Sequence, residues 1–435
     1  MKLNSDQQFA VDSVVDGFLE KNLPGLTILG EGGTGKTTSV MAAVQRLLDA
    51  GLKVLMTAPT NKAVKQLEKS ARSFGLSMND VAFQTLHSAL GLAMLPNEEN
   101  KIAVKSGKGV LMLFDVIVVD EASMLSQRAL FDHLLPQSEE HEVKILFMGD
   151  DMQLPPVKEQ KSRAFEVFDK VRLTKVERQA GDSGILTLNA PLREAIRNGT
   201  RFMAPDEYGQ GVEVVLAANF LKYVVSQFDA DTDLDQQRVL AWRNSRVDEI
   251  NNAIRRKIFG KDAARFEVGE RVVTGGPIRS GDVALLSTDE ECIVKQVSEG
   301  TVEDEETGEL YKTHMLVLNP IHAEIRQVIT HVIHDQELDR YWGRLNELAG
   351  LAKKFPAEAR GYWAMYHRFK DLFSNIRYCY CLTVHRSQGS TYRRAFVDLN
   401  DILANNIRTE RQSLIYVAFS RPSEELVINK RRFVA

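Results

Sequence analysis

Apolar and polar positions along the first part of the chain follow the rhythm of an α/β protein. Short apolar runs that suit buried strands occur in LTIL (26–29), VLMTA, VIVV and KILFMG. Between them lie amphipathic segments such as NKAVKQLEKSARSF, where apolar residues recur at helical spacing and lysines separate them. Strands that alternate with helices predict a parallel sheet, so we expect an α/β domain over about the first 150 residues.

The pattern changes along the rest of the chain. Residues 91–111 predict a small hairpin or loop, after which strand and helix alternate again from residue 157. Residues 265–377 then predict short strands with acidic and glycine turns, followed by two helices that separate near Pro356. The α/β pattern returns at residue 378, so the sequence predicts a second α/β domain with a β-rich and helical insertion.

Composition is that of an ordinary globular protein, since 44% of the 435 residues are hydrophobic and 26% are charged. The N-terminus lacks the apolar segment of a secretory signal, and the longest apolar run is too short to span a bilayer. Three cysteines are too few for a disulfide framework or a four-thiolate zinc site. The net charge of −4 does not exclude nucleic-acid binding, because local basic surface decides phosphate contact.

One glycine-rich segment carries a chemical signature. Residues 30–38 read GEGGTGKTT, which satisfies G-x-x-x-x-G-K-[ST] between a predicted strand and a predicted helix. Glycines let successive backbone amides converge on a phosphate, and the helix N-terminus adds the positive end of its dipole. Lys36 would face the β- and γ-phosphates and Thr37 would bind Mg²⁺, so the segment predicts a nucleoside triphosphate site. A flexible turn without a ligand is the alternative.

Polar residues elsewhere extend this prediction. In a triphosphatase, Asp120 would hold the Mg²⁺ shell, and Glu121 would orient and deprotonate the attacking water. Gln153 could reach the γ-phosphate as a neutral hydrogen-bonding group, or belong to a solvated loop. Arg178 and Arg421 are candidates for neutralising the transferred phosphoryl group. Because both lie in the second α/β domain, such a contact would make domain closure depend on ATP.

The motifs, taken in order, resemble those of superfamily 1 helicases. They are SDQQ, GEGGTGKTT, TAPTNKAV, FQTLHSALG, VVDEASM, GDDMQLPPV, LTKVERQ, LTVHRSQGST and YVAFSRP. The TLHS, GDxxQLPPV and TVHRSQG segments are similar to the RecD/Dda branch, superfamily 1B, whose members move 5′ to 3′ on single-stranded DNA. The LPNEENKIAV and RRKIF segments resemble most closely the phage Dda-type helicases. The resemblance covers nearly the whole chain and is weaker in the insertions.

This resemblance implies an α/β fold with two RecA-like parallel-sheet P-loop domains. Domain 1A would comprise residues 1–90 and 112–156, with residues 91–111 inserted as a hairpin, the pin. Domain 2A would comprise residues 157–264 and 378–435, with an SH3-like β-barrel and a helical extension inserted at residues 265–377.

The resemblance also assigns a nucleotide site, in which Gln7 would contact the adenine edge. The implied ATP-binding residues are Gln7, Gly32, Gly33, Thr34, Gly35, Lys36, Thr37, Thr38, Gln388 and Gly389. The implied catalytic residues are Lys36, Glu121, Gln153, Arg178 and Arg421, with Mg²⁺ on Thr37 and Asp120.

Single-stranded DNA would follow loops of both α/β domains. The implied contacts are Pro59, Thr60, Asn61, Thr85 and His87 in the first domain and Trp242, Asn244, Thr383 and His385 in the second. Hydroxyl, amide and imidazole groups suit phosphates, and a ring face suits any base. Trp242 could equally fill the core, and either histidine could be structural. The lysines at positions 62, 65, 101, 105 and 108 are phosphate contacts or ordinary solvated charges.

The inserted hairpin departs from the Dda pattern, which offers an aromatic ring there. This sequence has Ala103 at the aligned position and no Phe, Tyr or Trp between Gly91 and Leu113. Met94, Leu95 or Ile102 could supply an apolar wedge, or the pin could act sterically. The last motif reads SRP in place of the usual TRA but keeps its arginine.

We therefore expect an ATP-dependent 5′→3′ DNA helicase and single-stranded DNA translocase. Three alternatives share its motifs: a translocase that displaces proteins from DNA with little unwinding, an RNA helicase, and a nucleotide-regulated assembly factor that is no motor. The expected partners are single-stranded DNA and junctions of single- and double-stranded DNA, with a single-stranded-DNA-binding protein or replication and recombination factors as further candidates. We expect a monomer without a membrane partner, in the cytoplasm of a bacterium or a phage-infected host.

Overall fold

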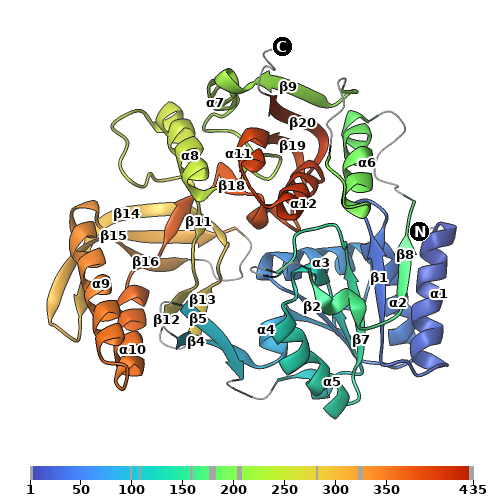
Figure 1. Ribbon diagram of the computed structural model, residues 1–435. Helices are drawn as coiled ribbons and strands as arrows, with labels where there is room; N and C mark the ends of the chain where they lie inside the picture. The colour runs from blue at the N-terminus through green and yellow to red at the C-terminus, as the bar shows by residue number, and fades with distance from the viewer. Residues whose placement is uncertain are drawn as a thin grey trace. The chain divides into compact units, whose positions relative to one another are not determined.

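The computed structural model of the protein describes residues 3–97, 100–105, 107, 109–156, 159, 161–175, 183–202, 208–280, 283–321 and 327–430. Contacts divide the chain into two compact units (Figure 1). Unit 1 comprises Met1–Leu92, Gly107–Ile254 and Tyr380–Ala435, and unit 2 comprises Ala93–Ser106 and Arg255–Cys379.

The first lobe of unit 1 is built on a six-stranded parallel sheet of order β3-β2-β6-β7-β1-β8. Its strands are β1 (Gly25–Gly30), β2 (Val54–Ala58), β3 (Val81–Thr85), β6 (Val116–Val119), β7 (Lys144–Gly149) and β8 (Lys170–Leu173). All four apolar runs form strands, as predicted. Because β8 pairs with β1, the first sheet continues past residue 156, where the sequence placed the start of the second domain.

Alternating side chains cover both faces of this sheet, as its near-continuous apolar strands require. Ile28 and Met56 point to the core under α1, α2 and α3, whereas Leu29 and Leu55 point to the opposite core. The helical segments of this lobe are α1 (Ser5–Leu19), α2 (Lys36–Asp49), α3 (Asn61–Phe74), α4 (Leu86–Ala89), η1 (Leu111–Leu113), η2 (Ala122–Met124), the π-helix η3 (Ala129–Leu134), α5 (Leu135–Glu140) and η4 (Arg163–Glu166).

The second lobe of unit 1 contains a five-stranded parallel sheet of order β18-β10-β19-β20-β9. Its strands are β9 (Val212–Leu216), β10 (Gln237–Ala241), β18 (Cys381–Thr383), β19 (Tyr392–Val397) and β20 (Pro422–Lys430). Its helices are α6 (Gly184–Arg197), α7 (Ala217–Ser226), α8 (Asn244–Phe259), η6 (His385–Ser387), α11 (Leu399–Leu403) and α12 (Arg408–Phe419), and α8 continues into unit 2 from Arg255. The two parallel sheets confirm the predicted α/β class.

A side chain supports the edge strand β18. Asn251 of α8 donates from Nδ2 to the Cys381 carbonyl at 3.1 Å, and its Oδ1 accepts from the Cys381 amide at 2.7 Å. This amide side chain therefore satisfies backbone groups that an edge strand would otherwise leave unpaired. The short strand leading to the HRSQG segment is fixed in this way.

Unit 2 contains a five-stranded antiparallel sheet of order β16-β15-β14-β11-β17 and two two-stranded sheets. Its strands are β4 (Leu92–Asn97), β5 (Asn100–Lys105), β11 (Arg271–Thr274), β12 (Ile278–Ser280), β13 (Val283–Leu286), β14 (Glu291–Asp304), β15 (Glu309–Pro320), β16 (Val328–Ile333) and β17 (Ile376–Tyr378). Its helices are η5 (Asp335–Glu337), α9 (Leu338–Lys354) and α10 (Ala359–Asp371), which separate around Pro356 as predicted.

The insertion differs from the prediction in its sheet. No strand pairing among the described residues closes the antiparallel sheet into a barrel. An aromatic core joins the two helices to it, since Tyr311 of β15 packs edge-on against Phe369 and Phe373, with ring centroids 5.3 and 5.8 Å apart. The predicted pin forms the pair β4–β5, and nearly all of it falls in this compact unit.

The three cysteines are buried and unpaired with one another. Across the described part of the chain, every helix is too short or too polar to cross a membrane.

Candidate functional site

The loop between β1 and α2 has the geometry of a phosphate cradle. Gly33 and Gly35 have φ values of 87° and 81°, a left-handed conformation that favours glycine. The Thr34 hydroxyl donates to the Glu31 carbonyl at 2.9 Å and braces the turn from inside. The amides at the start of α2 have no partner within the helix and can bind an anion. The predicted residues on this loop and the first turn of α2 are Gly32, Gly33, Thr34, Gly35, Lys36, Thr37 and Thr38.

Lys36 begins α2 and turns its ammonium group back toward the loop. Its Nζ donates to the carbonyls of Gly30 at 2.5 Å and Glu31 at 3.0 Å. A positive charge is therefore held at the cradle, as the motif predicts.

Gln7 supports the loop from α1. Its side chain and that of Asn4 form a capping box, in which Gln7 Oε1 accepts from the Asn4 amide at 3.0 Å. Gln7 Nε2 donates to the Thr34 carbonyl at 3.3 Å. The start of α1 thus packs directly on the phosphate loop, with both polar atoms of the Gln7 side chain engaged, and the contact of Gln7 with an adenine edge stays a prediction.

Asp120 and Glu121 follow β6 directly and lie beside the loop. The Glu121 amide donates to Asp120 Oδ1 at 2.7 Å, and Glu121 has φ of 48°, uncommon for a residue other than glycine. Burial raises the pKa of both carboxyl groups, and the nearby Lys36 ammonium acts against that rise. The left-handed backbone of Glu121 is strained, and such local strain is typical of functional sites.

Two glutamines carry buried polar atoms without partners. Gln153 Oε1 and Gln388 Nε2 are both buried and make no hydrogen bond within the described residues. Gln153 comes from the first lobe and Gln388 from the second. Buried polar atoms are normally satisfied, so these two atoms are available to a polar ligand. A methyl group on the adjacent Gly389 would lie 4.0 Å from Glu121 Oε1, which places the HRSQG segment next to the predicted catalytic carboxylate.

Arg421 of the second lobe lies within electrostatic reach of Glu121. Burial lowers the pKa of its guanidinium group, while the Glu121 carboxylate acts in the opposite direction. Its Nη1 donates to the Ser390 carbonyl at 3.0 Å, and its Nε donates to the Val417 carbonyl at 3.1 Å. Arg421 is therefore held rigidly near the acidic end of the predicted site. Arg178 lies outside the described residues.

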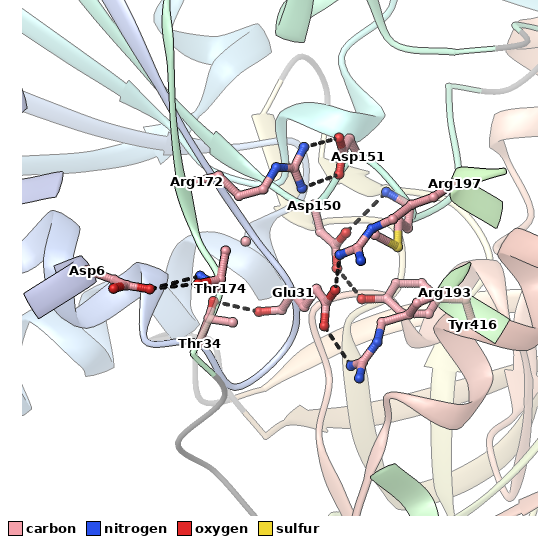
Figure 2. A network of polar contacts seen from close by, with 12 residues as sticks. Asp6, Glu31, Thr34, Asp150, Asp151, Arg172, Thr174, Arg193, Arg197 and Tyr416 are labelled. Carbon is pink, nitrogen blue, oxygen red and sulfur yellow. Dashed lines mark hydrogen bonds and ion pairs between the residues drawn. The ribbon is translucent and has the colours of Figure 1, made fainter. Parts of the chain in front are cut away.

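A polar network joins the two lobes at the phosphate loop (Figure 2). The Glu31 carboxylate forms ion pairs with Arg193 and Arg197 of α6, with nitrogen–oxygen distances of 2.6 and 2.7 Å. The Tyr416 hydroxyl of α12 donates to Asp150 Oδ2 at 2.6 Å, just beyond β7. The sequence prediction missed these five residues, because each is an ordinary polar position in its own helix or loop. The signal was the placement of Glu31 in GEGGTGKTT, Asp150 in GDDMQ and Tyr416 in YVAFSRP, three segments that the resemblance singled out.

The residues present fit Mg²⁺ with a triphosphate. Among the described residues, no group of three or more His, Cys, Asp or Glu side chains could hold a metal ion by itself. Mg²⁺ at phosphate sites needs only one or two protein ligands, because water and phosphate oxygens supply the others. The Thr37 hydroxyl and the Asp120 carboxylate are ligands of the kind that Mg²⁺ accepts, and Asp120 lies within electrostatic reach of the Lys36 ammonium, so their role as its ligands stays a prediction.

The predicted DNA contacts of the first lobe share one edge of its sheet. Ala58 of β2 is paired in register with Thr85 of β3, so the loops after these strands begin side by side. Thr60 and Thr85 each cap a helix by accepting from a backbone amide, at 3.2 and 3.3 Å. Each hydroxyl retains its hydrogen for a phosphate oxygen. Pro59 and Asn61 flank Thr60, and His87 is exposed.

The second lobe repeats this arrangement. Ala241 of β10 is paired with Thr383 of β18, which brings the start of α8 next to the HRSQG segment. Trp242 is half-buried, and its backbone amide donates to Asp401 Oδ2 at 2.8 Å. The backbone that carries the ring is therefore fixed. Burial lowers the pKa of His385, which favours a neutral ring near pH 7. The remaining predicted contact, Asn244, begins α8.

Some predicted contacts receive no structural description. The side chains of Met94, Leu95, Lys101, Ile102 and Lys105, and all of Lys108, lie outside the described residues. The predictions for them stay predictions.

Replacing Gly35 by alanine should destabilise the loop. An added Cβ would lie 2.2 Å from Gln7 Nε2, and the left-handed backbone alone costs an L-residue about 1–2 kcal/mol. Gly32→Ala is the matched control, because its Cβ would meet nothing within 4 Å. Thermal unfolding should show a lower melting temperature for Gly35→Ala only. Equal melting temperatures for the two variants would contradict this account of the loop.

Comparison with known proteins places this geometry in a family. Residues 2–210 match the AAA domain family, and residues 378–428 match the UvrD-like helicase C-terminal domain. The ATP-dependent DNA helicase dda of Enterobacteria phage T4 is 27% identical over 453 residues, covering 96% of this chain and 97% of that protein. Uncharacterized protein R530 of Acanthamoeba polyphaga mimivirus is 25% identical over 500 residues, covering 97% of this chain and 99% of that protein.

Solved structures share the fold. The Pif1 helicase from Candida albicans superposes with a TM-score of 0.52 at 16% identity, covering 99% of this chain and 94% of that one. Bacteroides Pif1 in complex with ADP-AlF3 and ssDNA gives a TM-score of 0.51 at 15% identity, covering 98% of this chain and 92% of that one. The parallel sheets are therefore those of the RecA-like P-loop helicase fold. The motifs, the site geometry and these relatives together support a superfamily 1B helicase similar to those of the RecD, Dda and Pif1 type.

Proposed function

We propose that the protein is an ATP-dependent DNA helicase that moves 5′ to 3′ along single-stranded DNA and separates duplex ahead of it. The observation that carries this proposal is the meeting of Glu121 of the first lobe with Gly389 and Arg421 of the second. A nucleotide held there touches both lobes, so its hydrolysis can change how the lobes sit against each other.

In the proposed mechanism, the phosphate loop and Lys36 hold the triphosphate, and Glu121 orients and deprotonates the attacking water. Mg²⁺, held by Thr37 and Asp120, would neutralise charge on the phosphate oxygens. Gln153 Oε1 supplies an acceptor for the water. Arg421, and in the same role Arg178, would stabilise the charge of the transferred phosphoryl group. Gln7 and the glutamine and glycine of HRSQG would complete the nucleotide contacts.

Single-stranded DNA would lie across the loops that follow β2, β3, β10 and β18. These loops give each lobe one grip, made of hydroxyl, amide and imidazole groups with Trp242 as a stacking surface. The Bacteroides Pif1 complex with ssDNA supports such binding. If the lobes close with ATP and open after hydrolysis, the two grips alternate and the strand advances.

The pin and the insertion would act together at the duplex. Most of the pin falls in one compact unit with the insertion, which supports a role of the insertion in bracing the pin. We propose that the insertion around the antiparallel sheet forms the SH3-like barrel of the family and holds the pin at the junction. The domain boundaries predicted from the sequence, with β8 moved to the first domain, complete this proposal.

A translocase that displaces proteins from DNA is the second candidate. The absence of Phe, Tyr and Trp from residues 92–112 favours it, because no ring is available there to stack on the last base pair.

The relative from phage T4 supports a cytoplasmic location in a bacterium or a phage-infected host. We further propose that the protein acts as a monomer. Its candidate protein partners are a single-stranded-DNA-binding protein and replication and recombination factors.

Lys36→Ala and Glu121→Gln should abolish DNA-stimulated ATP hydrolysis. Loss of the general base alone is expected to slow turnover by about 10²–10⁴-fold. The exposed residues Lys21 and Glu139 provide matched controls as Lys21→Ala and Glu139→Gln. Phosphate release with and without single-stranded DNA measures the effect. Near-normal turnover in either site variant would refute the assigned site, and wild-type turnover that ignores DNA would favour a non-motor role.

Duplexes with a 5′ or a 3′ single-stranded tail test the polarity. We expect unwinding of the 5′-tailed duplex and little of the matched 3′-tailed duplex. Displacement of a bound protein from the 5′-tailed strand without unwinding would favour the second candidate. Equal or 3′-only unwinding would contradict the proposed direction and leave the ATPase assignment intact.

A further inference from the structure

The phosphate loop contains an acid at a place where a polyphosphate anion must bind. Glu31 is the second residue of GEGGTGKTT, and its side chain is only 11% exposed. Like charges repel more strongly where water is excluded. By itself, Glu31 therefore works against the amides and the lysine that attract phosphate.

Two arginines of the other lobe neutralise this acid. Arg193 and Arg197 are four residues apart on α6, so they project from the same face of the helix. Arg193 Nη1 lies 2.6 Å from Glu31 Oε2, and Arg197 Nη2 lies 2.7 Å from Glu31 Oε1 (Figure 2). Each carboxylate oxygen thus has its own guanidinium partner. Burial raises the pKa of the Glu31 carboxyl group, and the two arginines act against that rise.

The same arginines line space next to the loop. Arg193 and Gly32 share a cavity of 220 Å³ with Tyr416. Arg193 and Arg197 share with Glu31 a second cavity of 600 Å³, above the end of β8. In the sheet, β1 separates β8 from β7 and β6, where the γ-phosphate residues lie. The α6 arginines pair with Glu31 at the end of β1, whereas Arg421 acts on Glu121 after β6, so the two sets of arginines serve different carboxylates.

We propose that Arg193 and Arg197 are positioning residues that make nucleotide affinity depend on docking of the second lobe. While α6 is docked, the two arginines compensate the negative charge of Glu31. The loop then attracts phosphate without repulsion from that carboxylate. When α6 moves away, the exposed negative charge weakens the site and favours nucleotide release. This rests on the proposed function, since it presumes a nucleotide at the loop. By linkage, a bound nucleotide must strengthen docking of α6 by the same factor.

Equilibrium binding of Mg·ADP and of a non-hydrolysable ATP analogue to the full chain tests this proposal. The variant R193Q/R197Q should bind on the order of tenfold more weakly, within the range typical of coupled sites. E31Q should bind as tightly as the unmodified chain or more tightly. Adding E31Q to R193Q/R197Q should restore affinity to within about threefold. R193K/R197K keeps both charges and should retain most of the affinity.

The sign of the E31Q effect separates this proposal from a purely structural ion pair. A pair that merely holds the lobes together would be broken equally by E31Q and by the arginine variants, so E31Q would weaken binding and rescue nothing. That result would overturn the proposal, and it needs no foldable arginine variant. R128Q removes an exposed arginine that pairs with Asp132 at 4.0 Å, and it should leave affinity unchanged.

Failure of the proposed function would look different. If the unmodified chain binds nucleotide but neither unwinds nor translocates, the helicase proposal fails while the charge coupling at Glu31 can still be measured. If the chain unwinds DNA and E31Q still weakens nucleotide binding, only the coupling fails.

Discussion

Charges that the second lobe brings to the phosphate loop of the first connect the two halves of the nucleotide site. Arg193 and Arg197 pair with Glu31 on one side of the loop, and Arg421 lies near Glu121 on the other. In the proposed mechanism, neither lobe alone would both bind a triphosphate and neutralise the charge that forms during its hydrolysis. In a site partly shielded from water these interactions are strong, so the position of one lobe determines the chemistry of the other.

In the proposed mechanism, the parallel sheets would carry this coupling to the DNA. Within the first lobe, β1, β6 and β7 end at the predicted nucleotide site, while β2 and β3 end at the predicted DNA contacts. The second lobe has the same division, since β10 and β18 end at predicted DNA contacts and the segment after β18 continues to Gly389. Because a closely packed sheet transmits displacements, a shift at the nucleotide site would move the proposed DNA contacts as well.

Local patterns could be predicted from the sequence, and distant pairings could not. The phosphate loop and the carboxylates after β6 follow from a few adjacent residues, and the structure places them together. Glu31 occupies an unrestricted position of the loop motif and meets an arginine 166 residues away, so spacing gave no signal. The assignment of β8 to the first sheet likewise depends on a pairing with β1 that no periodicity encodes.

The central claim is that nucleotide binding changes the relation between the lobes. Single-molecule energy transfer between Gln66→Cys on α3 and Asn252→Cys on α8 would measure it, because both positions are exposed and the three natural cysteines are buried. A non-hydrolysable ATP analogue with Mg²⁺ should shift the chain to one higher-transfer population, and Lys36→Ala should abolish the shift. An identical distribution with and without the analogue, in a chain shown to bind it, would contradict the claim.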